Sequence, residues 1–158
     1  MNTVKVRNII LGEGMPKICV PVTGRTKEEI SLRLEEALET EADLLEWRAD
    51  WYEQALEKER LLELLDFLRA ALGERPLLVT FRTREEGGEQ EAPREAYEAF
   101  LDTVLESGKA DLIDVELFRG EELLRNICRR AHEAGVAVAA SSHDFEGTPE
   151  KEEIIRRL

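Results

Sequence analysis

Short apolar runs alternate along this chain with longer stretches whose apolar residues recur at helical spacing. The runs indicate buried strands, and the longer stretches indicate helices that each bury one face. Strand starts recur about every 30 residues, near positions 17, 43, 77, 111 and 136. Because alternating strands and helices are typical of a parallel sheet, the pattern predicts an α/β fold with five strand–helix units.

Turn and cap residues mark the boundaries of these elements. Strands are predicted over residues 17–22, 43–48, 77–82, 111–118 and 136–141, and helices over 26–39, 54–72, 94–107, 121–134 and from 148 onward. Thr148 followed by Pro149 is the usual start of a helix, with a capping hydroxyl and then a proline at the first helical position. Ahead of the first strand, residues 4–6 and 9–11 are expected to pair as a small hairpin that turns at residues 7 and 8.

Two sheet architectures agree with five units. A flavodoxin-like, doubly wound sheet is complete at five strands, but the sequence lacks its glycine-rich phosphate loop after the first strand. A (β/α) barrel has eight units and typically about 250 residues, so this chain would then be a truncated piece of one. The polar residues inside the strands decide between the two.

Charged residues occur inside strands that are otherwise apolar. Glu46 and Arg48 are two positions apart and so point to the same side of their strand, and Asp114 and Glu116 repeat this spacing. Helices cover both faces of a doubly wound sheet, where burying such charges costs several kcal/mol each. A barrel lumen instead gathers them near the carboxyl ends of the strands. The charged strand residues therefore favour a barrel over a doubly wound sheet.

Polar residues also end or follow these strands, in the place where α/β enzymes carry their chemistry: Arg48, Arg82, Glu86 and His143. A histidine beside a carboxylate is a common acid–base pair, because the carboxylate fixes the tautomer of the ring and raises its basicity. In the simpler interpretation Glu46 and Glu116 are ion-pair partners that only hold the sheet together. That alternative stays open at this point.

The composition narrows the classes of partner. Lys and Arg number 22 against 35 Asp and Glu, and the formal charge of −13 disfavours broad contact with nucleic-acid phosphates. No apolar run approaches the roughly 20 residues that span a bilayer, and the first residues lack the pattern of a secretion signal. Cys19 and Cys128 have no partners at metal-ligand spacing, so we expect buried thiols and no metal site. These features predict a cytoplasmic protein without a membrane or nucleic-acid partner.

Six short motifs carry a resemblance to a known family. They are GEGMPKI at residues 12–18, LEWRAD at 45–50, PLLVTFRT at 76–83, EGGE at 86–89, DLIDVELF at 111–118 and SSHDF at 141–145. In this order and spacing, the chain resembles type I 3-dehydroquinate dehydratase, a hydro-lyase of the shikimate pathway of aromatic amino acid biosynthesis. The resemblance implies a (β/α)8 barrel, of which residues 1–158 would be a single domain that forms the amino-terminal portion with the first five units. It also implies 3-dehydroquinate as the small-molecule substrate, 3-dehydroshikimate as the product, and no metal or other cofactor.

The resemblance also implies roles for single residues. His143 would transfer the proton, and Glu86 would be its partner in forming and breaking down an imine. Glu46, Arg48 and Arg82 would line the substrate site, and the two arginines would supply positive charge for an anionic substrate. The family's Schiff-base lysine lies on a sixth strand, in a segment resembling Lys-Ile-Ala-Val, which the 158 residues do not include. We therefore expect this chain alone to be inactive, and we also expect a homodimer.

Two other functions remain open from the sequence. One is a non-catalytic barrel fragment that self-associates or pairs with another chain, because its last strand would present an unpaired edge. The other is a Schiff-base barrel of the class I aldolase type, which would need a different set of substrate contacts.

Overall fold

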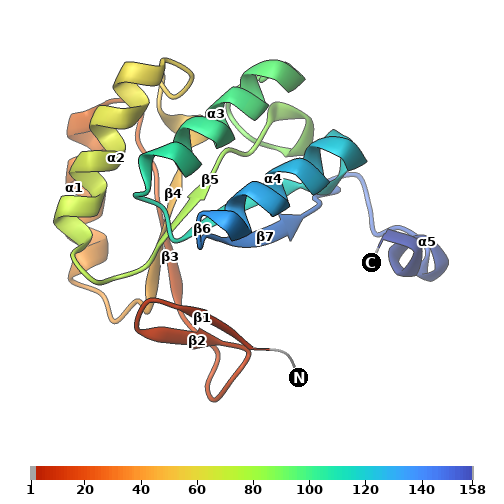
Figure 1. The fold of residues 1–158 in the computed structure, drawn as a ribbon, viewed down its shortest axis with the longest axis horizontal. Helices are drawn as coiled ribbons and strands as arrows, with labels where there is room; N and C mark the ends of the chain where they lie inside the picture. Colours follow the sequence, from red (N-terminus) through yellow and green to blue (C-terminus); the bar gives the residue numbers. More distant parts are fainter. Residues whose placement is uncertain (1–2, 158) are drawn as a thin grey trace.

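The computed structural model describes residues 3–157 and contains one sheet of five parallel strands (Figure 1). The strands are β3 (Cys19–Val22), β4 (Leu44–Arg48), β5 (Leu77–Thr80), β6 (Leu112–Glu116) and β7 (Ala137–Ser141). Their order in space is β3-β4-β5-β6-β7, so each strand pairs with the next one along the chain. A sequential order is that of a (β/α) barrel, whereas a doubly wound sheet reverses its order part-way. The doubly wound alternative is therefore excluded.

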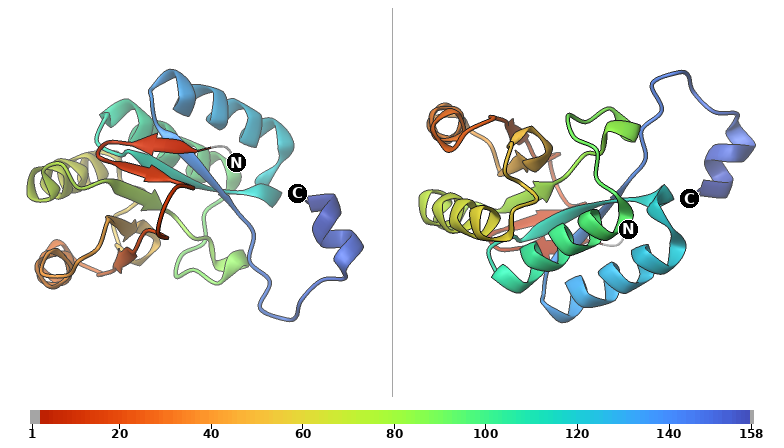
Figure 2. Two further views of the ribbon diagram at one scale, coloured as in Figure 1. Left: turned by 90° about the horizontal axis from the view of Figure 1, so that it is seen from below. Right: turned by 90° about the horizontal axis from the view of Figure 1, so that it is seen from above.

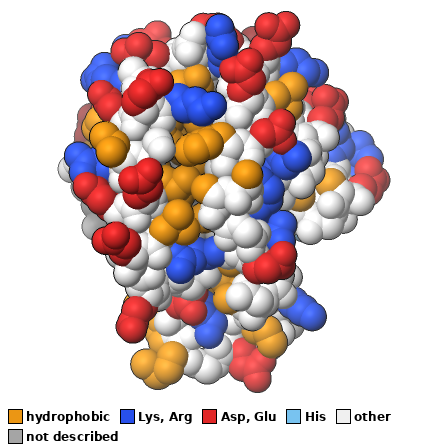
Figure 3. Space-filling model, turned by 90° about the vertical axis from the view of Figure 1, so that its left-hand side faces the viewer, with side chains coloured by type: hydrophobic (Ala, Val, Ile, Leu, Met, Phe, Trp, Pro, Cys, Tyr) orange, Lys and Arg blue, Asp and Glu red, His pale blue; other side chains and the backbone are white. Residues whose placement is uncertain are grey.

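Four helices connect the strands and pack along one side of the sheet (Figures 1 and 2). They are α1 (Lys27–Leu38), α2 (Lys58–Leu72), α3 (Arg94–Ser107) and α4 (Glu121–Glu133). On the side facing them, Trp47, Val79 and Ile113 of three adjacent strands are fully buried and belong to the main core. Figure 3 shows the outer face of the molecule on the α1 and α2 side, where acidic and basic side chains surround a band of hydrophobic ones.

The predicted amino-terminal hairpin is present. Strands β1 (Val4–Val6) and β2 (Ile9–Leu11) pair antiparallel, and Arg7 in the turn has a φ of 49°. The hairpin crosses below the amino ends of the parallel strands (Figures 1 and 2). There Val6 and Ile9 join Leu44 and Leu112 in a second apolar cluster. The hairpin therefore covers the lower end of the sheet and leaves the carboxyl ends of the strands for polar groups.

Several predicted bounds differ from the structure by a few residues. The strand predicted over 111–118 ends at Glu116, and the helix predicted from residue 54 begins at Lys58. Three short 3₁₀ turns follow strand ends or lie just beyond them: η1 (Ala49–Trp51), η2 (Arg84–Glu86) and η3 (Leu117–Arg119). The apolar pattern continues past Glu116 into Leu117 and Phe118 of η3, which is why the sequence placed the end of that strand too late, and Phe81 extends the pattern past the end of β5 in the same way.

The last helix does not begin where its cap residues predicted. Helix α5 spans Lys151–Arg157, and the Glu150 carbonyl accepts the N–H of Ile154 in its first turn. Thr148 is therefore not its cap, and the third residue after Thr148 is a lysine in place of the acid that completes a capping box. α5 lies apart from the sheet (Figures 1 and 2). Within residues 3–157, no helix has the length and apolar character needed to cross a membrane.

The expectation of two buried cysteines is wrong for this structure. Cys19 is exposed and Cys128 is half-buried. Cys19 lies on β3, which is an edge strand of the described sheet, so only one of its flanks is covered by a neighbouring strand.

Candidate active site

The inner side of the sheet carries an apolar lower layer and a polar upper layer. Leu44, Leu78 and Leu112 pack with the hairpin at the amino ends of the strands. Two residues further along β4 and β6 come Glu46 and Asp114, and two residues beyond these come Arg48 and Glu116. Alternation along a strand keeps each series on one face. The contacts of Arg82 with Asp114 and Glu116 confirm the prediction that these two carboxylates share one side of the sheet.

Arg82 follows β5 and is the centre of a buried ionic cluster. Its Nη1 donates to Glu116 Oε1 at 3.1 Å, to Ser141 Oγ at 2.9 Å and to Glu86 Oε2 at 3.4 Å. Its Nη2 donates to Asp114 Oδ1 at 2.9 Å. The residue is only 7% exposed, and Glu116 is fully buried. One guanidinium therefore connects the ends of three adjacent strands to the segment that carries Glu86.

Further bonds hold Glu116 in this cluster. The backbone N–H and the hydroxyl of Thr83 donate to its two carboxylate oxygens, each at 2.8 Å. Its own backbone N–H donates to the Tyr97 hydroxyl at 3.1 Å. Burial raises the pKa of both Asp114 and Glu116 above the ordinary values, while Arg82 and the hydrogen bonds oppose this shift. Burial likewise raises the pKa of Tyr97.

His143 and Glu86 form the predicted pair beside this cluster. His143 Nδ1 lies 2.9 Å from Glu86 Oε2, and the backbone N–H of His143 donates to the same oxygen at 3.0 Å. The ring stacks on that of Phe145, with centroids 6.4 Å apart and planes 14° from parallel. A cavity of about 280 Å³, lined by His143, Glu86, Glu116 and Ser142 among others, opens here. Within the described part of the chain, Nε2 has no hydrogen-bond partner.

Arg48 is held by an aspartate for which the sequence assigned no role. Its Nε and Nη2 donate to Asp50 Oδ1 and Oδ2 at 2.8 and 2.9 Å, and this bonding raises the pKa of Arg48. Glu46 is half-buried, and among residues 3–157 its carboxylate forms no ion pair with Arg48 or Arg82. The simpler interpretation thus fails for Glu46, whereas Glu116 does pair with Arg82.

The charge of this region differs from the expected local positive patch. Arg48 and Arg82 stand among five carboxylates, those of Glu46, Asp50, Glu86, Asp114 and Glu116. Each arginine is already paired, so the described residues offer little uncompensated positive charge to an anion. Residues 3–157 also hold no group of three or more His, Cys, Asp or Glu side chains suited to a metal ion.

The lysines of the described chain lie away from the polar upper layer. Lys27 covers the Phe67 ring, and Lys58 and Lys109 pair with carboxylates of neighbouring helices. Lys5 belongs to the hairpin, Lys17 precedes β3 at its amino end, and Lys151 begins α5. None of these six amines is placed to attack a substrate bound beside His143.

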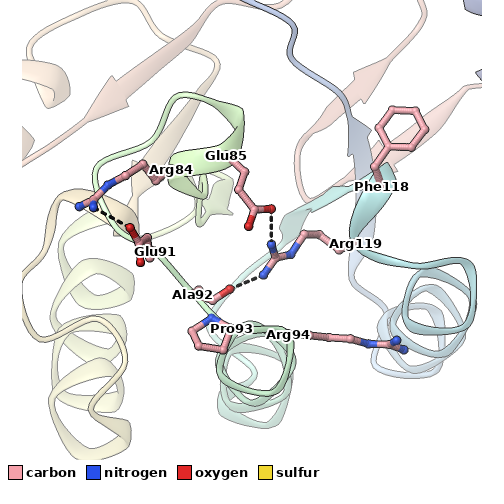
Figure 4. A pocket seen from close by; sticks show the side chains of 8 residues that line it. All are labelled: Arg84, Glu85, Glu91, Ala92, Pro93, Arg94, Phe118 and Arg119. Carbon is pink, nitrogen blue, oxygen red and sulfur yellow. Dashed lines mark hydrogen bonds and ion pairs between the residues drawn. The ribbon is translucent and has the colours of Figure 1, made fainter.

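A larger cavity of about 560 Å³ lies next to the histidine pocket (Figure 4). Arg119 on its wall donates to Glu85 at 2.8 Å and to the Ala92 carbonyl, and its guanidinium covers the Tyr97 ring. Arg84 pairs with Glu91 at 2.9 Å. Most polar groups that line this cavity therefore bind one another, and these bonds hold the segment that carries Glu86 in place.

Comparison with known proteins identifies the family of this chain. A family model described as type I 3-dehydroquinase matches residues 18–158. This chain belongs to that family. Proteins named 3-dehydroquinate dehydratase from Syntrophotalea carbinolica and Clostridium botulinum are each 46% identical to it, over 100% and 98% of its residues. The chain spans 62% and 61% of the lengths of these two relatives.

Solved structures of the type I 3-dehydroquinase family share the fold. The crystal structure of the Clostridium difficile enzyme with covalent modified comenic acid matches with a TM-score of 0.96 at 42% identity, covering 99% of this chain and 62% of that one. 3-Dehydroquinate dehydratase from Geobacillus kaustophilus matches with a TM-score of 0.93 at 36% identity, covering 98% and 60%. The predicted α/β barrel fold, of which this chain holds five units, is confirmed.

Proposed function

We propose that this chain supplies the proton-transfer part of a 3-dehydroquinate dehydratase, which converts 3-dehydroquinate to 3-dehydroshikimate. The observation that carries the proposal is the bond of 2.9 Å between His143 Nδ1 and Glu86 Oε2 at the carboxyl ends of the strands, in a chain of the type I 3-dehydroquinase family. We also infer that residues 1–158 form the amino-terminal portion of the barrel.

Glu86 sets the chemical role of each ring nitrogen. An ionised carboxylate only accepts hydrogen bonds, so Nδ1 carries the proton that it donates to Oε2. In the neutral ring the lone pair then lies on Nε2, which can act as a base, and His143 lines the cavity. This arrangement gives His143 a fixed tautomer without any movement of the backbone.

In the proposed reaction, a lysine amine condenses with the substrate ketone and forms an iminium. His143 Nε2 removes a proton from the carbon next to the iminium, and the C–H electrons move into the iminium, which acts as an electron sink. The electrons of the resulting enamine expel the hydroxyl, which takes this proton from the imidazolium and leaves as water. Hydrolysis of the iminium that remains then releases the product and the free amine. The amine would come from residues outside the 158, because the described lysines lie elsewhere.

The arginines take different parts in this proposal. Arg48 uses Nε and Nη2 on Asp50, which leaves Nη1 for a substrate oxygen, and Glu46 beside it has a free carboxylate for a substrate hydroxyl. Arg82 lines the site but donates its hydrogen bonds to protein groups, so its role is to position Glu86 and the neighbouring carboxylates. A cationic side chain from a part of the barrel outside these 158 residues would bind the carboxylate of the substrate.

A chimera tests the proposal. Residues 1–158 would be joined to the carboxyl-terminal part of the Clostridium difficile enzyme that this chain does not match, since the shared fold allows the junction. We expect the chimera to dehydrate 3-dehydroquinate, followed by the ultraviolet absorbance of the product, and to gain the substrate mass after borohydride reduction. His143→Ala in the chimera should lower kcat by about 10²–10⁴-fold, the usual contribution of general acid–base catalysis.

His132→Ala is the matched control, because His132 is exposed on α4. This variant should keep the activity of the chimera, and residues 1–158 alone should form no borohydride adduct. A folded chimera that turns over equally well with and without His143 would contradict the proposal. The homodimer stays a prediction, which the mass of the chain in solution, measured by light scattering, would test.

A further inference from the structure

Asp50 is a buried carboxylate whose oxygens accept four N–H groups. It lies in η1 (Ala49–Trp51), directly after β4, and is fully buried. Oδ1 accepts Arg48 Nε at 2.8 Å and the backbone N–H of Arg82 at 3.3 Å. Oδ2 accepts Arg48 Nη2 at 2.9 Å and the backbone N–H of Glu89 at 3.1 Å. A carboxylate offers about four acceptor positions, so this group is saturated.

The bond to Arg48 is two-pronged and therefore fixes the plane of the guanidinium. Two parallel N–H to oxygen bonds allow far less rotation than a single contact, and a buried charge is tolerated only when it is paired in this way. The fork uses the Nε edge of Arg48, and within residues 3–157 Nη1 has no hydrogen-bond partner. By fixing the plane of the guanidinium, Asp50 also fixes the direction in which Nη1 of Arg48 points.

Asp50 also anchors both ends of the segment that carries Glu86. The N–H of Arg82 precedes this segment, and the N–H of Glu89 lies three residues beyond Glu86. Gln90 adds two bonds from its side chain, to the carbonyls of Asp50 and Tyr52 at 2.8 and 2.7 Å. The same aspartate thus contacts the arginine of β4 and the base of the 83–91 segment.

We propose that Asp50 is a positioning residue that sets Arg48 for substrate and couples its orientation to the segment holding Glu86. This inference rests on the proposed function for the role of Arg48, but the coupling itself is a property of this chain. A saturated carboxylate shared between two parts of a site transmits a change in one part to the other, because neither part can move without taking a hydrogen-bond donor from the buried carboxylate.

The test compares Asp50→Asn with Asp111→Asn in the 158-residue chain. Asp111 is a matched control at the opposite end of the sheet, where its carboxylate accepts Arg7, Arg69 and the backbone N–H of Leu77. The asparagine at 50 keeps the volume and one oxygen, but it turns an NH₂ group toward two donors. Hydrogen exchange by NMR would follow the Arg48 Nε–H and the Glu89 amide, and urea unfolding would follow overall stability.

We expect Asp50→Asn to speed exchange at the Arg48 Nε–H and at Glu89 by at least about tenfold relative to Asp111→Asn, the factor that 1.4 kcal/mol of lost protection gives. In the chimera, Asp50→Asn should raise KM more than it lowers kcat, whereas Asp111→Asn should change neither. Equal exchange in the two variants would overturn the positioning role.

A second variant guards against a general loss of structure. If Asp50→Asn unfolds, Asp50→Glu keeps the charge but displaces its oxygens by one methylene, and the Arg48 Nε–H and the Glu89 amide should then exchange faster together. A change at only one of the two groups, or at neither, would refute the coupling. Should the chimera fail to bind 3-dehydroquinate at all, the proposed function fails on its own, and the exchange data still decide whether Asp50 couples the two parts.

Discussion

Arg82 provides the positive charge that pairs with three carboxylates of the candidate site. Its guanidinium contacts Glu86, Asp114 and Glu116, and of these Glu116 is fully buried. Carboxylates in such surroundings are costly unless they are paired, and burial accordingly raises the pKa of Asp114 and Glu116. The charge of Arg82 therefore stabilises the fold, and its side chain also lines the candidate site.

Removing this cation should strongly destabilise the chain. Arg82→Met keeps a long side chain but leaves buried carboxylates without their partner, which costs about 3–5 kcal/mol of unfolding free energy. Arg125→Met, at an exposed pair with Glu121 on α4, should cost less than about 1 kcal/mol. Urea unfolding at neutral pH measures both values, and similar losses in the two variants would refute the buried-pair account.

Asp114 should make stability depend on pH. Its pKa is raised in the folded chain, so the fold favours the protonated carboxyl. This contribution is fully present below the unfolded value, about 3.9, and is lost as pH rises through the raised folded value. Asp114→Asn keeps an oxygen for Arg82 and Ser141 but cannot titrate. The unfolding free energy of the natural chain should therefore fall relative to that of Asp114→Asn as pH rises from about 4 through the raised folded pKa; parallel curves would contradict this.

At the scale of elements, the 83–91 segment depends on close backbone packing. A Cβ at Gly88 would lie 1.8 Å from the carbonyl oxygen of Arg82, so no side chain fits without displacing the segment. The Gly88 N–H donates to the Thr83 carbonyl at 2.8 Å and closes the turn. Glu86 reaches His143 only while this turn is formed.

Gly88→Ala should consequently separate Glu86 from His143. We expect changed chemical shifts at the His143 ring and a loss of unfolding free energy of about 1–3 kcal/mol, the cost typical of a forced backbone shift. Gly147→Ala is the control, because a Cβ there meets no atom within 4 Å. Unchanged His143 shifts in Gly88→Ala would show that the pair does not depend on this turn.

The sequence predicted the elements and the charged side of the sheet, but not all of their contacts. Spacing by two placed Asp114 and Glu116 on one face, because alternation along a strand is a local property. The role of Asp50 was missed, since it depends on the Arg82 and Glu89 amides, which come from other elements. The start of α5 was misplaced because the cap signal at Thr148 lacks the acid that completes a capping box.

At the scale of the whole molecule, the hairpin and the ionic cluster occupy opposite ends of one sheet. Val6 and Ile9 cover the apolar lower layer, and Arg7 reaches Asp111 at 2.6 Å. The polar upper layer is left open toward the histidine pocket. This division gives the sheet one apolar, packed end and one polar end, and (β/α) barrels carry their active sites at the end that corresponds to the polar one.

The hairpin should contribute to overall stability through its inward face alone. Ile9→Ala removes a side chain that packs on Leu44 and Leu112, and should lower the unfolding free energy by about 2–5 kcal/mol. Ile10, its exposed neighbour, should tolerate the same change with a loss below about 1 kcal/mol. Thermal or urea unfolding compares the two variants, and equal effects would show that the hairpin is not packed on the sheet.

In the proposed site, Glu86 holds His143 with the lone pair of the ring on Nε2, and the nitrogen chemical shifts of the ring report this tautomer. With ¹⁵N-labelled histidine and a pH at which the ring is neutral, we expect His143 to carry its proton on Nδ1. The same measurement on Glu86→Ala should show the proton moving toward Nε2. A proton on Nε2 in the natural chain, unchanged by the substitution, would contradict the account.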